Sequence, residues 1–352
     1  MELALLKVFA PTVTAFTIGI LITPVVTHFL FKHKVWKKSG GKQALDGTIA
    51  AVFNELKGVG ETRTPRMGGI VIWASVILTV ALLFLLDWSF PNTLFAELDF
   101  FSRSQTWVPL AALLIGALIG LLNDFYDVTH AGAGLRLRTR LIFITLLAGS
   151  IAWWFYDKLE VSSIGIPFSG YLEVGWLIIP IFILLTMALY ASGVIDGIDG
   201  LSGGVFTAIF AGYAGVAYSQ SQFDLAALCG TLAGATLAFL WFNIPPARFW
   251  MTETGTMALT LALSVIVFMT DSLGGGHGIS LLLIIGLPLV ATVFSNILQI
   301  TSKKIWGRKL FRIAPLHHHF EAIGWPSYKV TMRYWVISIA CALLGLALAP
   351  LL

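Results

Sequence analysis

Apolar residues in this chain gather in long runs that short polar connections separate. Ten of these runs are long enough, or nearly so, to cross a bilayer, which takes about 20 residues. They lie at residues 11–31, 68–86, 107–123, 140–156, 176–191, 203–219, 224–242, 256–270, 279–300 and 334–351. The pattern predicts an all-α polytopic membrane protein with about ten transmembrane helices, forming a single integral-membrane domain over residues 1–352. Because the fifth and eighth runs are short, we expect their ends to lie in polar protein rather than in lipid.

Composition excludes the main alternative classes of protein. Apolar and aromatic residues make up 57% of the 352 residues, and charged residues make up only 11%, against about 25% in an ordinary soluble domain. A disordered chain would need low hydrophobicity and high charge. A disulfide scaffold is excluded because both cysteines, Cys229 and Cys341, lie within apolar runs.

The distribution of basic residues is more informative than the net charge of +4. The connections after odd-numbered runs hold 19 of the 22 lysines and arginines, and the other side holds only Lys7, Arg103 and Lys158. Because positive residues stay in the cytoplasm, the odd-numbered connections are predicted to be cytoplasmic and both termini outside. The outer carboxylates are expected to be solvated loop charges; they are Asp87, Glu97, Asp99, Asp157, Glu160, Glu173, Asp224 and Asp271.

Four polar clusters lie where a predicted helix meets a cytoplasmic connection. They are residues 123–127, 196–200, 243–255 and 315–321. In the first cluster, Asp124 and Asp127 are three positions apart and share a face if the helix continues. An acid at a helix end can also serve only as a cap or reach the interface. Four clusters on one membrane face favour an active site over that simpler explanation.

The residue types in these clusters suit phosphoryl chemistry. Several carboxylates without cysteine favour a hard cation such as Mg²⁺, which takes oxygen ligands and substrate phosphates. Arg136, Arg138, Arg140 and Arg248 could donate hydrogen bonds to phosphate, although the positive-inside pattern alone also explains arginines there. The adjacent His317, His318 and His319 could suggest zinc, but tetrahedral zinc usually draws on separated ligands. The triplet therefore fits better as part of a site that other loops complete.

Several motifs identify a family. The most specific stretch is APLHHHFEAIGWPSYKVTMRYW at residues 314–335, and further matches are TPRMGG at 64–69, Gly134-Leu135, DGIDGL at 196–201 and Asn243 with Pro246-Ala247. With these motifs the chain resembles the polyprenyl-phosphate N-acetylhexosamine-1-phosphate transferases over nearly its whole length. Within that family, the 314–335 stretch is most similar to members that act on a muramoyl-pentapeptide donor.

The resemblance implies a reaction and its setting. It implies Mg²⁺-dependent transfer of phospho-MurNAc-pentapeptide from UDP-MurNAc-pentapeptide to undecaprenyl phosphate, which gives lipid I and UMP in peptidoglycan synthesis. The implied location is the bacterial inner membrane, with the active site on the cytoplasmic face. The implied partners are the two substrates and the lipid bilayer, a homodimer is compatible with the family, and no nucleic acid is expected.

Matching the motifs position by position assigns roles to residues of this chain. The resemblance implies that Asp124 and Glu253 bind the metal. It implies further catalytic roles for Asp196, Asp199, His317, His318 and His319. The implied substrate contacts are Asn123, Arg138, Arg140, Gly197, Ile198, Asn243 and Trp250.

The chain also departs from the family pattern. Asn123 replaces the first acid of an Asp-Asp pair, Glu253 replaces an aspartate, and Gly193 replaces an asparagine; Glu61 and Arg66 are further departures. Asn123 can form hydrogen bonds but cannot carry charge or act as a base. Two alternatives therefore stay open: a weakened paralogue that binds polyprenyl phosphate or nucleotide sugar without turnover, and a UDP-GlcNAc-dependent GlcNAc-1-phosphate transferase. A transporter is less favoured, because its acids would lie near the membrane midplane.

Overall fold

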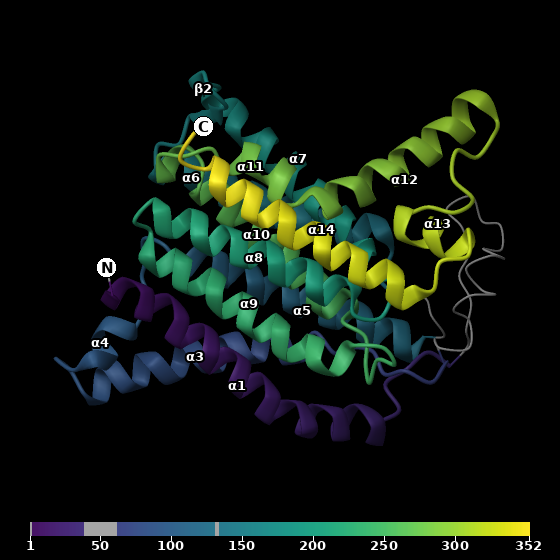
Figure 1. Cartoon of the computed structure of the whole chain (residues 1–352), viewed down its shortest axis with the longest axis horizontal. Coiled ribbons are helices and arrows are strands. Elements are labelled where there is room, and N and C mark those ends of the chain that lie inside the picture. The colour runs from purple at the N-terminus through teal and green to yellow at the C-terminus, as the bar shows by residue number, and fades with distance from the viewer. Residues whose placement is uncertain (1, 39–61, 131–133) are drawn as a thin grey trace.

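The computed structural model describes residues 2–38, 62–130 and 134–352, and helices that run along one common direction dominate it (Figure 1). The longer helices are α1 (Glu2–Lys32), α3 (Ile70–Ser89), α5 (Trp107–Thr129), α6 (Leu137–Lys158), α7 (Ile178–Ser192), α8 (Leu201–Ser219), α9 (Phe223–Asn243), α10 (Thr252–Met269), α12 (Leu287–Trp306) and α14 (Ser327–Leu348). The shorter ones are α4 (Leu94–Leu98), α11 (Gly278–Ile285) and α13 (Leu316–Ala322), with 3₁₀ turns η2 (Gly175–Leu177), η3 (Gly193–Ile195) and η4 (Ser272–Gly274). Strands β1 (Ser163–Ile166) and β2 (Gly170–Glu173) pair antiparallel.

The prediction of about ten membrane spans is confirmed. Among the described residues, nine helices are long and apolar enough to cross a membrane, and the pair α11 and α12 makes a tenth if it is one broken span. The run 279–300 is not one continuous helix, because α11 and α12 meet at 78°. Pro288 lies in the first turn of α12 and has no N–H to continue the hydrogen bonds of α11 past Gly286.

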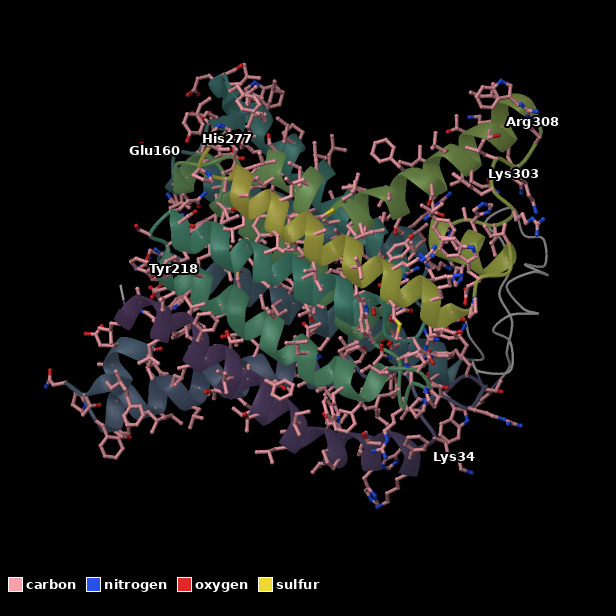
Figure 2. The ribbon with its side chains drawn as sticks, viewed as in Figure 1. Lys34, Glu160, Tyr218, His277, Lys303 and Arg308 are labelled. Carbon is pink, nitrogen blue, oxygen red and sulfur yellow. The ribbon has the colours of Figure 1, made fainter. Side chains whose placement is uncertain are left out.

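The two ends of the helix bundle differ in charge. Lys34, Lys303 and Arg308 lie at one end, which we call the basic end, while Glu160 and His277 lie at the other (Figure 2). Both termini also lie at that other end, which we call the terminal end (Figure 1). This arrangement agrees with an even number of crossings. Which end faces the cytoplasm stays a prediction from the positive-inside rule.

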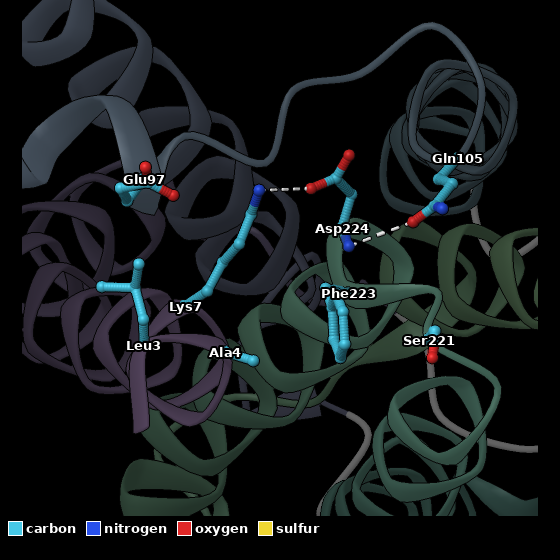
Figure 3. A pocket seen from close by; sticks show the side chains of 8 residues that line it. All are labelled: Leu3, Ala4, Lys7, Glu97, Gln105, Ser221, Phe223 and Asp224. Atoms are coloured by element: carbon cyan, nitrogen blue, oxygen red, sulfur yellow. Dashed lines mark hydrogen bonds and ion pairs between the residues drawn. The ribbon is translucent and has the colours of Figure 1, made fainter. Parts of the chain in front are cut away.

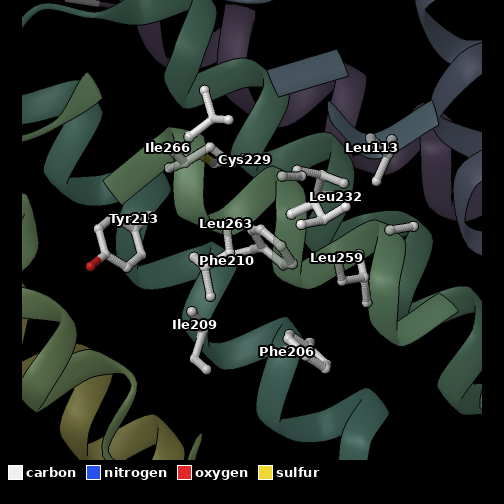
Figure 4. Close-up of a cluster of buried hydrophobic side chains, with 14 of the residues drawn as sticks. Leu113, Phe206, Ile209, Phe210, Tyr213, Cys229, Leu232, Leu259, Leu263 and Ile266 are labelled. Carbon is white, nitrogen blue, oxygen red and sulfur yellow. The ribbon is translucent and has the colours of Figure 1, made fainter. Parts of the chain in front are cut away.

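Helix α10 forms the centre of the bundle. In its 18-residue apolar stretch, 94% of the residues are buried, against 22% in the corresponding stretch of α1. Figure 4 shows the apolar packing around it, in which Leu259 and Leu263 of α10 lie among Phe206 and Phe210 of α8. This burial places the short eighth run inside the protein rather than at its outer surface.

Small residues let neighbouring helices approach closely. A Cβ atom added at Gly234 of α9 would lie 2.1 Å from the carbonyl oxygen of Thr12 in α1, and Gly230 one turn earlier also faces Thr12. This GxxxG spacing is a common contact between membrane helices. At the basic end, a Cβ at Gly120 of α5 would lie 2.2 Å from the carbonyl oxygen of Glu253. The contact therefore places the start of α10 directly against α5.

The β-hairpin packs on the loop between α10 and α11 at the terminal end. Asp271 is 1% exposed, and its two carboxylate oxygens accept the backbone N–H groups of Gly165 at 2.7 Å and Ile279 at 2.9 Å. Burial raises the pKa of Asp271, and these hydrogen bonds oppose the rise. The expectation of a solvated loop charge is wrong for Asp271, because the folded loop uses its carboxylate to join the hairpin to α11.

A hollow of about 380 Å³ also lies at the terminal end (Figure 3). There Lys7 Nζ lies 2.6 Å from Asp224 Oδ1, and Gln105 Oε1 accepts the backbone N–H groups of Asp224 and Leu225 at the start of α9. None of the predicted site residues lines this hollow. Lys7, Gln105 and Asp224 thus already contact one another, so the hollow is a junction of α1, the loop before α5 and α9 rather than a candidate active site.

Candidate active site

Asp124 is the most firmly held acid of the site. It is fully buried near the end of α5, and its Oδ2 accepts hydrogen bonds from Thr252 Oγ1 at 2.5 Å, Thr254 N at 2.8 Å and Thr254 Oγ1 at 2.6 Å. The other oxygen, Oδ1, lies 3.4 Å from Asn123 Nδ2 and 3.9 Å from Arg66 Nη2. One carboxylate oxygen is thus fixed by α10, while the other keeps only weak contacts and can accept another ligand.

Thr252, the first residue of α10, joins two of the predicted acids. Its hydroxyl contacts Asp124, and its backbone N–H donates to Asp196 Oδ2 at 2.8 Å. Asp196 also accepts Ser202 Oγ at 2.6 Å. Burial raises the pKa of Asp196, and these two hydrogen bonds lower it in part. Thr252 has φ = +54°, which is unusual for a β-branched residue, and such strain is concentrated at functional sites.

Asp127 lies one turn beyond Asp124 and is paired with cations. Arg66 Nη2 lies 2.9 Å from Asp127 Oδ2 and 3.9 Å from Asp124 Oδ1, so one guanidinium faces both acids. Lys37 Nζ also lies 3.9 Å from Asp127 Oδ2. The prediction that Asp124 and Asp127 share a helix face is confirmed, because α5 continues to Thr129.

Glu253 forms a direct ion pair with Arg140. Nη1 of Arg140, in the first turn of α6, donates to Glu253 Oε1, and both side chains are partly buried, with 20% and 26% of their surface exposed. Glu253 lies between the two threonines that bind Asp124, which puts both predicted metal ligands at the same helix start. Arg138, by contrast, is exposed to solvent in this structure.

The loop before α8 is tied to the loop before α10 by neutral donors. Asp199 Oδ1 accepts Trp250 Nε1 and Oδ2 accepts the backbone N–H of Ala247, both at 3.0 Å. Asn243 Oδ1 accepts the backbone N–H of Gly200 at 2.9 Å, while its Nδ2 donates to a carbonyl of its own loop at 2.8 Å. These contacts explain how the segment holds its acids without a lysine or arginine in its sequence.

The histidine triplet divides between two environments. His317 and His318 are buried beside Gly197, where a Cβ atom would lie 2.5 Å from His318 Nε2 and 2.8 Å from His317 Nε2. His318 Nδ1 lies 2.7 Å from Glu321 Oε2, so this carboxylate orients the ring. His319 instead accepts a backbone N–H of the preceding loop through Nδ1, at 3.2 Å. Only the first two histidines therefore lie against the 196–200 loop.

The sequence is similar to known proteins over most of its length. Residues 106–271 match the family described as Glycosyl transferase family 4. The chain is also 33% identical over 291 residues to a phospho-N-acetylmuramoyl-pentapeptide-transferase of Geobacillus sp. (strain WCH70), and the alignment covers 81% of this chain and 84% of that relative. The chain belongs to the phospho-N-acetylmuramoyl-pentapeptide-transferase family. This confirms the family that the motifs predicted.

For a member of the phospho-N-acetylmuramoyl-pentapeptide-transferase family, the donor set at the start of α10 fits a hard cation. Within the described ranges, no group of three or more histidine, cysteine or acidic side chains is arranged to hold a metal. Mg²⁺ needs fewer protein ligands than three, because it commonly binds through one or two carboxylates together with substrate phosphates. Asp124 Oδ1 and the Glu253 carboxylate offer that number of oxygen ligands.

Some residues of this site were not identified from the sequence. Thr252 and Thr254 supply the donors for Asp124, and Ser202 supplies one for Asp196. Their position beside Glu253 and after the DGIDGL motif was the available signal, but hydroxyl residues are too common for it to be specific. Ile198, a predicted substrate contact, is 4% exposed.

Proposed function

We propose that the chain transfers phospho-MurNAc-pentapeptide from UDP-MurNAc-pentapeptide to undecaprenyl phosphate, giving lipid I and UMP. The observation that carries the proposal is the relative named for this transfer, which aligns with 81% of the chain at 33% identity. The contacts that join α5, α10 and the 196–200 loop at the basic end supply a matching site. We place that end in the cytoplasm of a bacterium, and the helices in its inner membrane.

In the proposed reaction, an oxygen of the lipid phosphate attacks the β-phosphorus of the donor. A new P–O bond forms as the bond to the UMP oxygen breaks, and UMP leaves with the electron pair. Because a phosphate monoester has a second pKa of about 6, its oxygen is already ionised near neutral pH. The reaction therefore needs no strong base, and the uncharged Asn123 is compatible with turnover.

Asp124 and Glu253 are the residues that would hold Mg²⁺. The bound ion would neutralise charge on the donor diphosphate, which is a main requirement of phosphoryl transfer. The three hydrogen bonds to Asp124 Oδ2 keep the other oxygen, Oδ1, in a fixed direction. Arg138 and Arg140 extend from the start of α6 and would add donors for the phosphates.

The remaining predicted residues would bind the nucleotide. Gly197, Ile198 and Asp199 form the loop against which uridine would lie, and Trp250, held by Asp199, would offer its ring for stacking on uracil. Asn243 keeps this loop in place through Gly200. The buried His317 and His318 would stand next to the diphosphate, with His319 as an outer contact.

A reconstituted assay tests the proposal. Purified protein with Mg²⁺ and undecaprenyl phosphate should release UMP from UDP-MurNAc-pentapeptide, and a chelator should stop the release until Mg²⁺ is restored. Asp124→Asn and Glu253→Gln should each slow release by about 100-fold, because each removes charge from the transition-state site. Asp157→Asn, an exposed acid at the terminal end, is the matched control.

The same assay addresses the alternatives that Asn123 and Glu253 keep open. UMP released only from UDP-GlcNAc would identify a GlcNAc-1-phosphate transferase. Binding of a UDP-sugar without release of UMP from any donor would contradict the enzyme proposal and support a binding paralogue.

A further inference from the structure

Arg140 and Glu253 form a contact whose role the proposed reaction leaves unexplained. Arg140 occupies Oε1 of a carboxylate that would have to bind a metal ion. We infer that Arg140 is an exchangeable counter-ion: it neutralises Glu253 in the free protein and turns to the donor diphosphate when a divalent cation binds Glu253. The inference rests on the proposed function, since it concerns the same metal and the same donor.

The two predicted metal ligands are held very differently. Asp124 is fully buried, and neutral hydroxyl and amide donors fix one of its oxygens. Glu253 is a quarter exposed, and in the described part of the chain Arg140 is the hydrogen-bond partner of its carboxylate. Asp124 can therefore stay in place while a ligand binds, whereas Glu253 changes partner at little structural cost.

Arg140 is also able to move. It lies in the first turn of α6, and its long side chain can swing while the helix backbone stays fixed. Its Nε is buried without a hydrogen-bond partner, so the guanidinium is not held by a full set of acceptors. A diphosphate would offer the several oxygens that this planar group prefers.

The charges around the site favour joint binding of metal and donor. Lys37, Arg66 and Arg140 face Asp124, Asp127 and Glu253, so the ion-pair network of the free protein is close to neutral. A divalent cation alone would add two positive charges beside Arg140. The donor diphosphate removes that conflict, because it gives Arg140 a new anionic partner. The free protein should therefore bind divalent cations weakly, and a nucleotide diphosphate should strengthen that binding.

Binding of Mn²⁺ to the full-length protein tests this exchange. It is measured by electron paramagnetic resonance, first without nucleotide and then with UDP. Arg140→Gln should bind Mn²⁺ alone about tenfold more tightly than the wild type, because a competing positive charge is gone. The strengthening by UDP should be smaller in the same variant, because only the direct contact between the phosphates and the metal remains. Arg140→Lys keeps the charge and should stay near the wild type, and Arg308→Gln, an exposed arginine at the basic end, is the matched control.

Several outcomes would overturn the exchange. It is wrong if Arg140→Gln binds Mn²⁺ no more tightly than Arg308→Gln, or if the gain persists in the double variant Arg140→Gln/Glu253→Gln. Failure of the proposed function looks different. If the wild-type protein releases no UMP but Arg140→Gln still binds Mn²⁺ more tightly than the wild type, the proposed transferase is contradicted and the exchange stands.

Discussion

At the scale of single residues, each acid of the site is stabilised in its own way. Threonine hydroxyls serve Asp124, the Arg66 guanidinium serves Asp127 and the Arg140 guanidinium serves Glu253. This division follows from burial, because a buried carboxylate without partners would be very unfavourable. Glu253, which is more exposed than Asp124 and Asp127, is paired with the single cation Arg140.

Asn123 has a structural task that an aspartate could also perform. Its Oδ1 accepts the backbone N–H of Leu135 at 3.0 Å, and a carboxylate would keep that hydrogen bond. We expect Asn123→Asp to change the rate of UMP release by less than about threefold, because the lipid phosphate is already ionised. A rise of tenfold or more in steady-state UMP release would instead show that the natural site is weakened by the missing acid. Asn123→Ala, which loses the acceptor, should release UMP more slowly than both.

At the scale of elements, close backbone contacts decide where the site residues stand. Gly120 brings α5 against the start of α10, and Gly69 lies against Gly255 on the other side of that start, where an added Cβ would lie 2.2 Å from the Gly255 nitrogen. Helix α13 brings His317 and His318 onto the 196–200 loop. The site is therefore a junction of helix ends and loops rather than the product of one motif.

Gly197 tests the junction with α13. An alanine there would place its Cβ 2.5 Å from His318 Nε2, so either the loop or the ring must shift. A displacement of about 1 Å can cost about 100-fold in rate, and we expect Gly197→Ala to lose UMP release by that order. Gly149→Ala is the control, because a Cβ there meets only Ile183 at 3.8 Å. Equal rates of UMP release by Gly197→Ala and Gly149→Ala, purified in the same way, would show that activity does not depend on the close contact between Gly197 and the histidines.

At the scale of the whole molecule, the basic residues and the candidate active site lie at the same end of the bundle. The basic residues Lys34, Lys303 and Arg308 mark that end in Figure 2. The ion pairs of Arg66 and Arg140 belong to connections that the sequence assigns to the same membrane face. The opposite end has a hairpin, a buried Asp271 and the Lys7–Asp224 pair, all of which join elements together.

Cysteine labelling in intact cells tests the orientation. In a variant whose two native cysteines, Cys229 and Cys341, are replaced by alanine, Ser169→Cys in the hairpin turn should react with a membrane-impermeant maleimide. Arg308→Cys at the basic end should react only after the membrane is opened, because basic loops stay inside. Labelling of Arg308→Cys in sealed cells would reverse the assigned orientation.

The sequence by itself determined the class of protein, the number of spans, the end that carries the basic residues and the family. Each depends on a property that local composition expresses directly, since apolar length, positive charge and a specific motif such as HHHFE need no knowledge of packing. The sequence also placed Asp124 and Asp127 on one face, because helical periodicity is local.

Only the tertiary structure decided which groups meet. Three findings depend on contacts between residues distant in sequence: the burial of Asp271, the split of the histidine triplet and the pairing of Arg140 with Glu253. A fourth, the break between α11 and α12, depends on how the two helices pack. A one-dimensional pattern records that a residue is charged, but its partner depends on how helices approach in space. The position of Glu253 follows from that approach, because the close contact between α5 and α10 sets it beside Asp124 within reach of Arg140.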